Sequence, residues 1–247
     1  MKETKIIMGM PITIELENRI DAEDAARDVF DYFTYVDETF SPFKTTSELS
    51  KINRGELREH ERSEDMKTVF ALSEQTRIET DGYFDITTPE GIYNPSGLVK
   101  GWAIWNASKM LDEKGFKRYY VNAGGDIQVR GKNSKGENWK VGIRNPLSKD
   151  KIVKAITPGN GGTATSGIYE RGEHIYNPHM HGTPVKEILS ITVIGPDIYE
   201  ADRFATAAFA MGRKGILFIE RRPGLEGYMI DTTGLATMTS GFEQYVS

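Results

Sequence analysis

The sequence predicts one intertwined α+β domain over residues 1–247, with helices in the first half and a β-rich second half. Apolar residues recur at helical spacing in three stretches before Gly115, whereas short strand-like segments dominate after it. Neither an internal repeat nor a low-complexity linker divides the chain. Its 247 residues, 38% of them hydrophobic, are enough to bury a large core.

The first half is expected to hold a strand-like segment and three helices. Residues 5–16 are strand-like around an interruption at Gly9-Met10-Pro11. Periodic apolar residues, with Gly82 and Gly115 as stops for the second and third helices, predict three helices. These span residues 21–40, 63–79 and 98–114.

The second half reads mainly as short strands bounded by turns. The strands predicted are residues 119–121, 126–130, 139–143, 151–156, 227–230 and 235–238. A last helix, residues 198–211, carries alanines and phenylalanines at helical spacing.

Composition excludes several classes of function. Lys and Arg total 31 against 36 Asp and Glu, so the net charge of −5 offers no broad basic surface for nucleic acid. The absence of cysteine excludes disulfides, thiolate catalysis and sulfur-held zinc, and fits a reducing compartment. The first residues show no cleavage-site pattern and no lipidatable Cys, and no apolar run is long enough to cross a bilayer. A cytoplasmic protein without a membrane anchor is expected.

Residues 165–182 contain three of the four histidines beside hydroxyl groups and Arg171. Their glycines and Pro178 predict a folded loop that faces something polar, and not a core strand. His174 lies in the sequence HIYNP, which indicates a short strand that delivers one imidazole to a turn and favours a functional role. For His179 and His181 a solvated turn is the simpler interpretation.

Two glycine-containing motifs suit phosphate or close ligand approach. In NPSGLVKGWA, residues 94–103, a turn opens a helix whose free N–H groups and Lys100 could meet a phosphate. On spacing alone, an ordinary capped helix start with a solvated Lys100 is the favoured interpretation. In NAGGD, residues 122–126, two glycines and an acid follow a strand, and a plain hairpin turn would look the same.

Two further motifs carry oxygen or aromatic groups. Asp202 and Thr206 lie four residues apart, on one helical face, and could hold a hard cation such as Mg²⁺. Alternatively, Asp202 caps the helix start and Thr206 bonds back to a carbonyl. The run Tyr83-Phe84-Asp85 stands at a predicted strand entry, where aromatic core is the default.

Together these motifs resemble those of the FAD:protein FMN transferases, the ApbE-like flavinyltransferases, over nearly the whole chain. The resemblance runs through MGMP, FSPFKTTSELSKIN, GYFDI, PSGLVKGWA, NAGGD, TSGIYER, HIYNPHMHGTP, SITV and ADRFATAAFAMG. It implies an α+β fold of the family's own type. It also implies an enzyme that binds FAD with Mg²⁺ and transfers FMN to a Thr or Ser hydroxyl of a target protein while AMP departs.

The resemblance also implies roles for individual residues. Met8 and Phe43 would lie near the flavin, with Phe43 in place of a usual Tyr, and Asn94, at a position that is commonly Asp, would contact the dinucleotide with Lys100. The remaining FAD-site residues implied are Tyr83, Phe84, Asp85 and His174. The metal ligands implied are the Gly97 carbonyl, Asp202, Thr206 and the Ala205 carbonyl.

His174 and Asp202 would be the catalytic residues, because His174 matches the family histidine that helps to activate the attacking hydroxyl. The segment between Asp85 and Asn94 is shorter than in many members of the family. Two other functions stay open: a non-catalytic flavin-binding or carrier protein, and an Mg²⁺-dependent FAD pyrophosphatase in which water replaces the protein hydroxyl.

Overall fold

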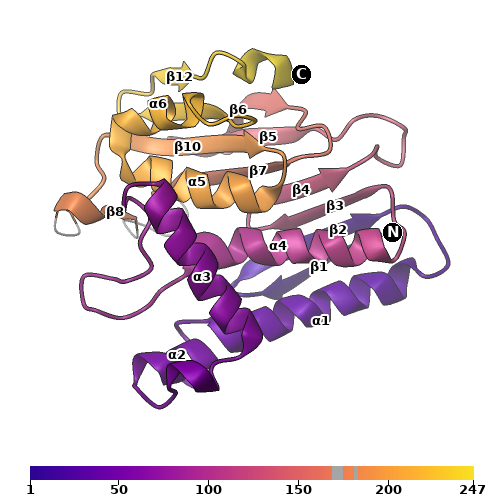
Figure 1. Cartoon of the computed structure of the whole chain (residues 1–247). Helices are drawn as coiled ribbons and strands as arrows, with labels where there is room; N and C mark the ends of the chain where they lie inside the picture. Colours follow the sequence, from indigo (N-terminus) through magenta and orange to yellow (C-terminus); the bar gives the residue numbers. More distant parts are fainter. Residues whose placement is uncertain (169–174, 181–182) are drawn as a thin grey trace.

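A computed structural model of the protein describes residues 1–168, 175–180 and 183–247. Within these ranges an eight-stranded sheet forms the centre, and its neighbouring strands are antiparallel. The order across the sheet is β1 (Lys2–Ile7), β2 (Met10–Leu16), β3 (Tyr119–Ala123), β4 (Asp126–Arg130), β7 (Gly162–Gly167), β10 (Ile188–Gly195), β11 (Glu226–Asp231) and β12 (Ala236–Met238). Strands from both ends of the chain therefore share one sheet, as Figure 1 shows.

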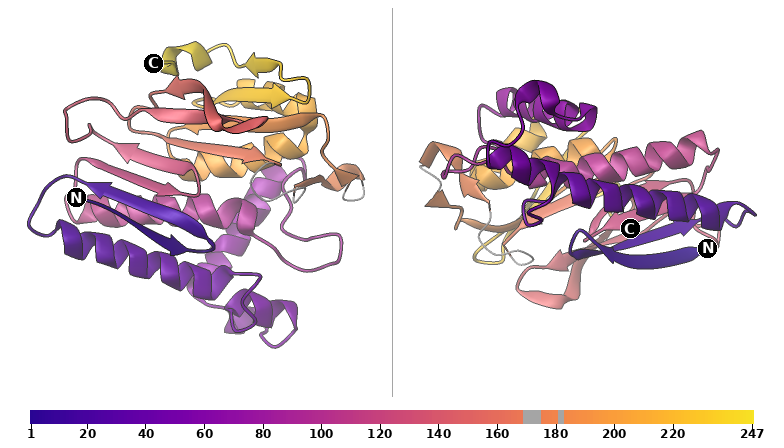
Figure 2. Two further views of the ribbon diagram at one scale, coloured as in Figure 1. Left: turned by 180° about the vertical axis from the view of Figure 1, so that it is seen from behind. Right: turned by 90° about the horizontal axis from the view of Figure 1, so that it is seen from below.

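The helices lie on one face of this sheet, as the edge-on view in Figure 2 shows. They are α1 (Ala22–Phe40), α2 (Glu48–Asn53), α3 (Glu64–Glu79), α4 (Ser96–Glu113), α5 (Ile198–Ala210) and α6 (Gly215–Glu220). The hairpin of β5 (Val141–Asn145) and β6 (Ser148–Ile156) lies on the opposite face. Side chains of β10 alternate between the two resulting cores, since Val193 packs with the helices and Ile194 with the hairpin side. The structure is α+β, as the sequence predicts.

The long helices form where the apolar spacing predicts them. In α1, Ala26, Val29 and Phe33 are fully buried on one face. Ser63 caps α3 by accepting a hydrogen bond from Met66 N, and α4 ends just before Gly115, whose φ is +82°. None of the helices in the described ranges is long and apolar enough to cross a membrane.

The prediction of a loop over residues 165–182 is wrong at its start, because Thr165 to Gly167 belong to β7, between β4 and β10. The sequence of β7, GTATSG, has small polar residues where a strand usually shows branched or aromatic ones. GYFDI does not enter a strand either; it lies in the α3–α4 connection. Helices α2 and α6 and strand β10 were not predicted as elements.

Small residues in β7 let α5 approach the sheet closely. A Cβ at Gly162 would lie 2.2 Å from Ile198 N and 2.3 Å from its Cα. Ile198 N also donates to Gln128 Oε1 of β4 at 2.8 Å, and Asp197 caps α5 by accepting from Glu200 N. The N-terminal turn of α5 therefore rests directly on the backbone of β7, which fixes the height of the helix above the sheet.

Candidate functional site

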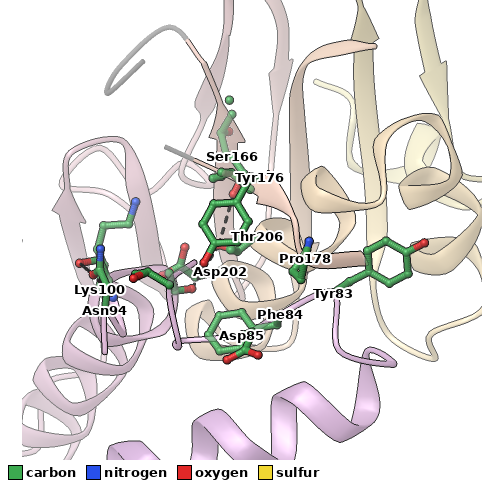
Figure 3. Close-up of a pocket in the computed structure, with 16 residues that line it drawn as sticks. Tyr83, Phe84, Asp85, Asn94, Lys100, Ser166, Tyr176, Pro178, Asp202 and Thr206 are labelled. Carbon is green, nitrogen blue, oxygen red and sulfur yellow. Dashed lines mark hydrogen bonds between the residues drawn. The ribbon is translucent and has the colours of Figure 1, made fainter. Parts of the chain in front are cut away.

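Two adjoining cavities lie at the start of α4. The smaller, of about 140 Å³, is bounded by α4, α5, β7 and the connection that follows α3 (Figure 3). The larger, of about 810 Å³, opens between α4, the β1–β2 turn and the segment after α1. Asn94, Ser96 and Lys100 line both, so they mark the boundary between the cavities.

Most of the residues implied by the resemblance lie around these cavities. Those on the smaller cavity are Tyr83, Phe84, Asp85, Asn94, Gly97, Lys100, Asp202 and Thr206. Met8 and Phe43 line the larger cavity. Ala205 is fully buried and lines neither cavity. His174 lies outside the described residues, as do Arg171 and His181.

The start of α4 is held by Asn94. Its Oδ1 accepts from Ser96 Oγ at 2.6 Å and from Ser96 N at 3.2 Å. The interpretation as an ordinary capped helix start is wrong for the cap, because the N-cap residue is Pro95, which makes no side-chain cap hydrogen bond, and Asn94 precedes it. It is also wrong for a solvated lysine, because the Lys100 side chain is 16% exposed and forms an ion pair with Asp126.

Asp202 is buried in the contact between α5 and α4. Its Oδ2 accepts a hydrogen bond from Gly101 N at 2.7 Å, and its exposed fraction is 3%. A Cβ at Gly101 would lie 2.5 Å from Asp202 Cβ, so the two helices meet closely at this point. The alternative in which Asp202 caps the helix start is wrong, because Asp197 is the cap.

Thr206 also faces α4. Its Oγ1 donates to the carbonyl of Gly97 at 3.1 Å, and Ser166 Oγ of β7 lies 3.5 Å from the same hydroxyl. The alternative in which Thr206 bonds back to its own helix is therefore wrong. In Figure 3, Ser166, Asp202 and Thr206 lie together in the middle of the cavity.

These groups form a set of oxygen donors. A carboxylate, hydroxyls and a backbone carbonyl are the kinds of ligand that Mg²⁺ takes. Among the described residues no group of three His, Cys, Asp or Glu could hold a metal ion, so a cation here would depend on carbonyl and hydroxyl oxygens as well as Asp202. The donor set fits a hard cation and does not fit a soft one.

The NAGGD motif forms the hairpin turn between β3 and β4, as the interpretation of this motif as a plain hairpin turn predicts. Gly124 and Gly125 have φ values of +60° and +102°, which favour glycine. The turn also delivers Asp126, which is 2% exposed and pairs with Lys100. Asp126 Oδ1 accepts from Thr165 N of β7 at 3.0 Å.

The aromatic run divides between core and cavity. Phe84 is buried in the main core, as the default interpretation states, whereas Tyr83 is half-buried. The Tyr83 ring meets the ring of His179 edge-on with centroids 4.5 Å apart. His179 Nε2 donates to the carbonyl of Asp81 at 2.7 Å, since a carbonyl oxygen can only accept. His179 is exposed, but it holds the turn that carries Tyr83.

Tyr176 closes the cavity from the short strand β8 (Tyr176–Asn177), which pairs with β9 (Thr183–Pro184). Its hydroxyl donates to the carbonyl of Thr87 at 3.3 Å. Burial raises the pKa of Tyr176, and the carboxylates of Asp85 and Glu90 raise it further. The phenol therefore keeps its proton and stays a donor at neutral pH.

An ionic network ties α3 to α5 behind the smaller cavity. Arg203 contacts Glu79 at 2.5 Å and Glu200 at 2.7 Å, with 5% of the arginine side chain exposed. Burial raises the pKa of Glu200 despite the arginine. Burial would also raise the pKa of Glu79, but hydrogen bonds from Gln75 and Arg203 outweigh it and lower that pKa. The network fixes the end of α3, from which the Tyr83 turn departs.

The larger cavity has an apolar rim. Met8 and Gly9, with φ values of +56° and +70°, form the two-residue turn between β1 and β2. Phe43 is 91% exposed beside them, and Lys44 forms an ion pair with Asp37 at 2.6 Å. A flat aromatic ligand could cover Phe43 and Met8 at this rim.

Sequence reasoning did not single out Ser166 and Tyr176 as site residues. Both lie in the segment 165–182 that was identified as polar and site-forming, so their hydroxyls were the available signal. The sequence places Asp126 in the NAGGD motif but does not predict its partner, because its contact with Lys100 depends on the packing of α4 against β4.

Comparisons with known proteins identify relatives in sequence and in fold. The chain is 32% identical over 177 residues to the FAD:protein FMN transferase of Escherichia coli, a match that covers 68% of this chain and 48% of that protein. The chain thus spans about half the length of the curated relatives it matches. The flavin transferase ApbE from Vibrio cholerae shares the fold, with a TM-score of 0.86 and 22% identity over 99% of this chain and 98% of that one.

The ApbE protein from Thermotoga maritima likewise shares the fold, with a TM-score of 0.87 and 20% identity over 100% of this chain and 99% of that one. The model of the ApbE family matches residues 8–91 and 93–229. These ranges include all the described residues that line the two cavities. Because this match extends over most of the sequence, the chain belongs to the ApbE family.

Proposed function

We propose that this chain, acting as one unit over residues 1–247, is an Mg²⁺-dependent enzyme that transfers FMN from FAD to a Thr or Ser hydroxyl of an acceptor protein and releases AMP. The observation that carries the proposal is the oxygen cluster of Gly97, Asp202 and Thr206 beside Lys100. The names of the curated relatives support FAD as donor and a protein as acceptor. The cytoplasmic location expected from the sequence stays a prediction.

The reaction exchanges one phosphorus–oxygen bond for another. The acceptor hydroxyl oxygen attacks the phosphorus of the FMN half, and the bond from that phosphorus to the bridging oxygen breaks. AMP leaves with the bridging oxygen, and a base takes the hydroxyl proton. Charge builds up on phosphate oxygens along this path, so the site must supply positive charge and fix the two reacting groups in line.

Asp202, Thr206 and the carbonyls of Gly97 and Ala205 would hold Mg²⁺ in this proposal. When bound, the ion would neutralise phosphate oxygens and favour departure of AMP. The described residues fit this role because Asp202 contributes a buried carboxylate and Thr206 already lies against the Gly97 carbonyl. Lys100 would add charge from the boundary between the cavities.

The two cavities together suit a dinucleotide. Asn94, Lys100 and the start of α4 would contact the diphosphate, and Met8 and Phe43 would cover the flavin. Calorimetric titration should therefore show tighter binding of FAD than of FMN. Equal affinities would mean that the adenylate half is not recognised, which would favour the carrier function.

The decisive experiment follows a candidate acceptor by intact-protein mass spectrometry after incubation with the protein, FAD and Mg²⁺. The expected product is heavier by FMN minus one water, with AMP formed in equal amount and both abolished by a chelator. AMP and free FMN without a labelled acceptor would instead identify a pyrophosphatase. FAD binding without any AMP would identify a carrier.

His174 is proposed as the base that takes the hydroxyl proton, on the resemblance alone. His174→Asn should keep FAD binding and slow single-turnover transfer by on the order of 10²- to 10⁴-fold. His60→Asn, at an exposed position between α2 and α3, is the matched control and should transfer at the parental rate. A rate for His174→Asn within about threefold of the parent, far less than a positioned base contributes, would remove the base assignment.

A further inference from the structure

Lys100 and Asp126 form a buried ion pair at the boundary between the two cavities. Lys100 lines both cavities, whereas Asp126 lines neither. The side chain of Asp126 is 2% exposed and that of Lys100 is 16% exposed. The carboxylate thus lies behind the lysine as seen from the cavities and cannot contact a ligand held in them.

The backbone of the sheet fixes the carboxylate in turn. Asp126 begins β4 directly after the Gly124-Gly125 turn, and its Oδ1 accepts from Thr165 N of β7 at 3.0 Å. The other oxygen, Oδ2, contacts Lys100 Nζ. Because two neighbouring strands hold Asp126, its carboxylate offers Lys100 an anchor that has little freedom to move.

We propose that Asp126 is a positioning residue that orients the Lys100 ammonium toward the diphosphate of FAD, an inference that rests on the proposed function. An ammonium group has three N–H donors, and the one directed at Asp126 constrains the directions of the other two. Lysine carries a flexible four-carbon stem, so without this contact the charge would sample many positions. The ordering is complete before the ligand arrives, which lowers the entropy lost on binding.

The competing explanation is that the pair only fastens α4 to β4. The structure contains a comparison for this, because Asp112 and Arg130 form an ion pair between the same two elements at their other ends. That pair lies outside both cavities. Asp112→Asn therefore measures how the loss of an α4–β4 ion pair that lies away from the cavities affects FAD binding.

The test measures the dissociation constant of FAD by calorimetry in the presence of chelator, so that metal binding plays no part. Asn matches Asp in shape and keeps an acceptor for Thr165 N. Asp126→Asn should weaken FAD binding by about tenfold, the effect of one charge-assisted hydrogen bond. Asp112→Asn should leave the dissociation constant at the parental value.

A double-mutant cycle with Lys100→Met separates positioning from simple support. If Asp126 acts through Lys100, adding Asp126→Asn to Lys100→Met should leave FAD affinity unchanged or raise it, because the second change then only removes a negative charge from the neighbourhood of an anionic ligand. An equal weakening in both backgrounds would overturn the inference. So would parental FAD affinity in Asp126→Asn.

Asp126→Glu is the variant to measure if Asp126→Asn does not fold. It keeps the charge but moves it by one methylene, so positioning requires weaker FAD binding, and parental binding would overturn the inference. Failure of the proposed function has a different signature. In that case the parent itself would show no FAD binding, or it would bind FAD and neither label an acceptor nor release AMP when Mg²⁺ is supplied.

Discussion

Helix α4 and strand β4 are joined near their beginnings by Lys100 and Asp126, and near their ends by Asp112 and Arg130. The first pair is 16% and 2% exposed and borders the cavities, whereas both members of the second are 36% exposed. Burying an ion pair carries a desolvation cost that the attraction between the two charges does not reliably offset. An exposed ion pair contributes little to the free energy of unfolding. Neither pair is therefore expected to add much to stability, and the position of the inner pair at the cavities is the feature on which the proposed binding role rests.

The largest expected effect lies at the inner end. Asp202→Asn keeps an acceptor for Gly101 N but removes the negative charge proposed to hold Mg²⁺. AMP release in saturating FAD should fall by on the order of 10³-fold, equivalent to a few kcal/mol of transition-state stabilisation, while the fold survives. Circular dichroism and an AMP assay check this, and release at the parental rate would exclude Asp202 from the metal site.

A smaller effect is expected from the close contact of α4 with α5. In Gly101→Ala the new methyl group would lie 2.5 Å from Asp202 Cβ and 2.9 Å from the carbonyl of Ile198. Overpacking should cost about 1–3 kcal/mol, and the better helix propensity of Ala should return about 1 kcal/mol, so the free energy of unfolding should fall by up to about 2 kcal/mol. Urea unfolding measures the change, and FMN transfer should fall with it.

Gly115→Ala is the matched control at the outer end of α4. Gly115 has a φ of +82°, and a Cβ there would meet nothing closer than Arg19 Nη1 at 3.6 Å. Left-handed backbone costs a residue with a side chain about 1–2 kcal/mol, so this variant should lose stability but keep FMN transfer. Equal losses of transfer in both glycine variants would show that the two ends do not differ.

Asp112→Asn should have a still smaller effect. Both side chains of the outer pair are partly exposed, so the loss of unfolding free energy should stay below about 1 kcal/mol. FMN transfer should be unchanged. A stability loss several times larger, seen in urea unfolding, would show that the outer pair supports the fold more than its exposure indicates.

The smallest effect at neutral pH concerns Tyr119, which lies beside the outer pair. Burial, together with the nearby carboxylate of Asp112, raises the pKa of Tyr119 to about 12. A raised pKa means that the folded state holds the phenol proton more tightly. The resulting stability is fully present below about pH 10, the value of an unfolded tyrosine, and is lost as the pH rises toward 12.

Thermal unfolding monitored at increasing alkaline pH, together with the ultraviolet absorbance of phenolate, tests this. Tyr119→Phe should show a shallower decline of the melting temperature above about pH 10 than the parent. Identical alkaline profiles would mean that Tyr119 titrates alike in both states.

The sequence predicts the long helices well because their buried faces require apolar residues at a periodic spacing. The buried face of α1, with Val29 and Phe33, needs no tertiary information. Strand β10 is buried on both faces, so ILSITVIG shows no alternation, and β7 is built from small polar residues. The residue types that suit these strands are determined by how α5 and the β5–β6 hairpin pack against them. The spacing of apolar residues in the sequence does not reveal that packing.

The candidate site follows the same division. Motifs predicted which residues gather, since Asp202, Thr206 and Lys100 do line one cavity. They did not predict the partners, because Asp202 bonds to a residue 101 positions away and Thr206 to one 109 positions away. Such pairings arise only when α4 and α5 pack. The roles assigned to these residues, and to His174, stay predictions.

Gly162 has a consequence for how this sequence can diverge. Its missing side chain is what allows Ile198 and the rest of α5 to settle on β7, so a residue with no reactive group sets where Asp202 and Thr206 stand. Any replacement would lift the helix and disturb the site without altering a single site residue. In a library of random variants selected for flavin transfer, we expect Gly162 to be as intolerant of change as Asp202, although it lines neither of the cavities proposed to hold FAD.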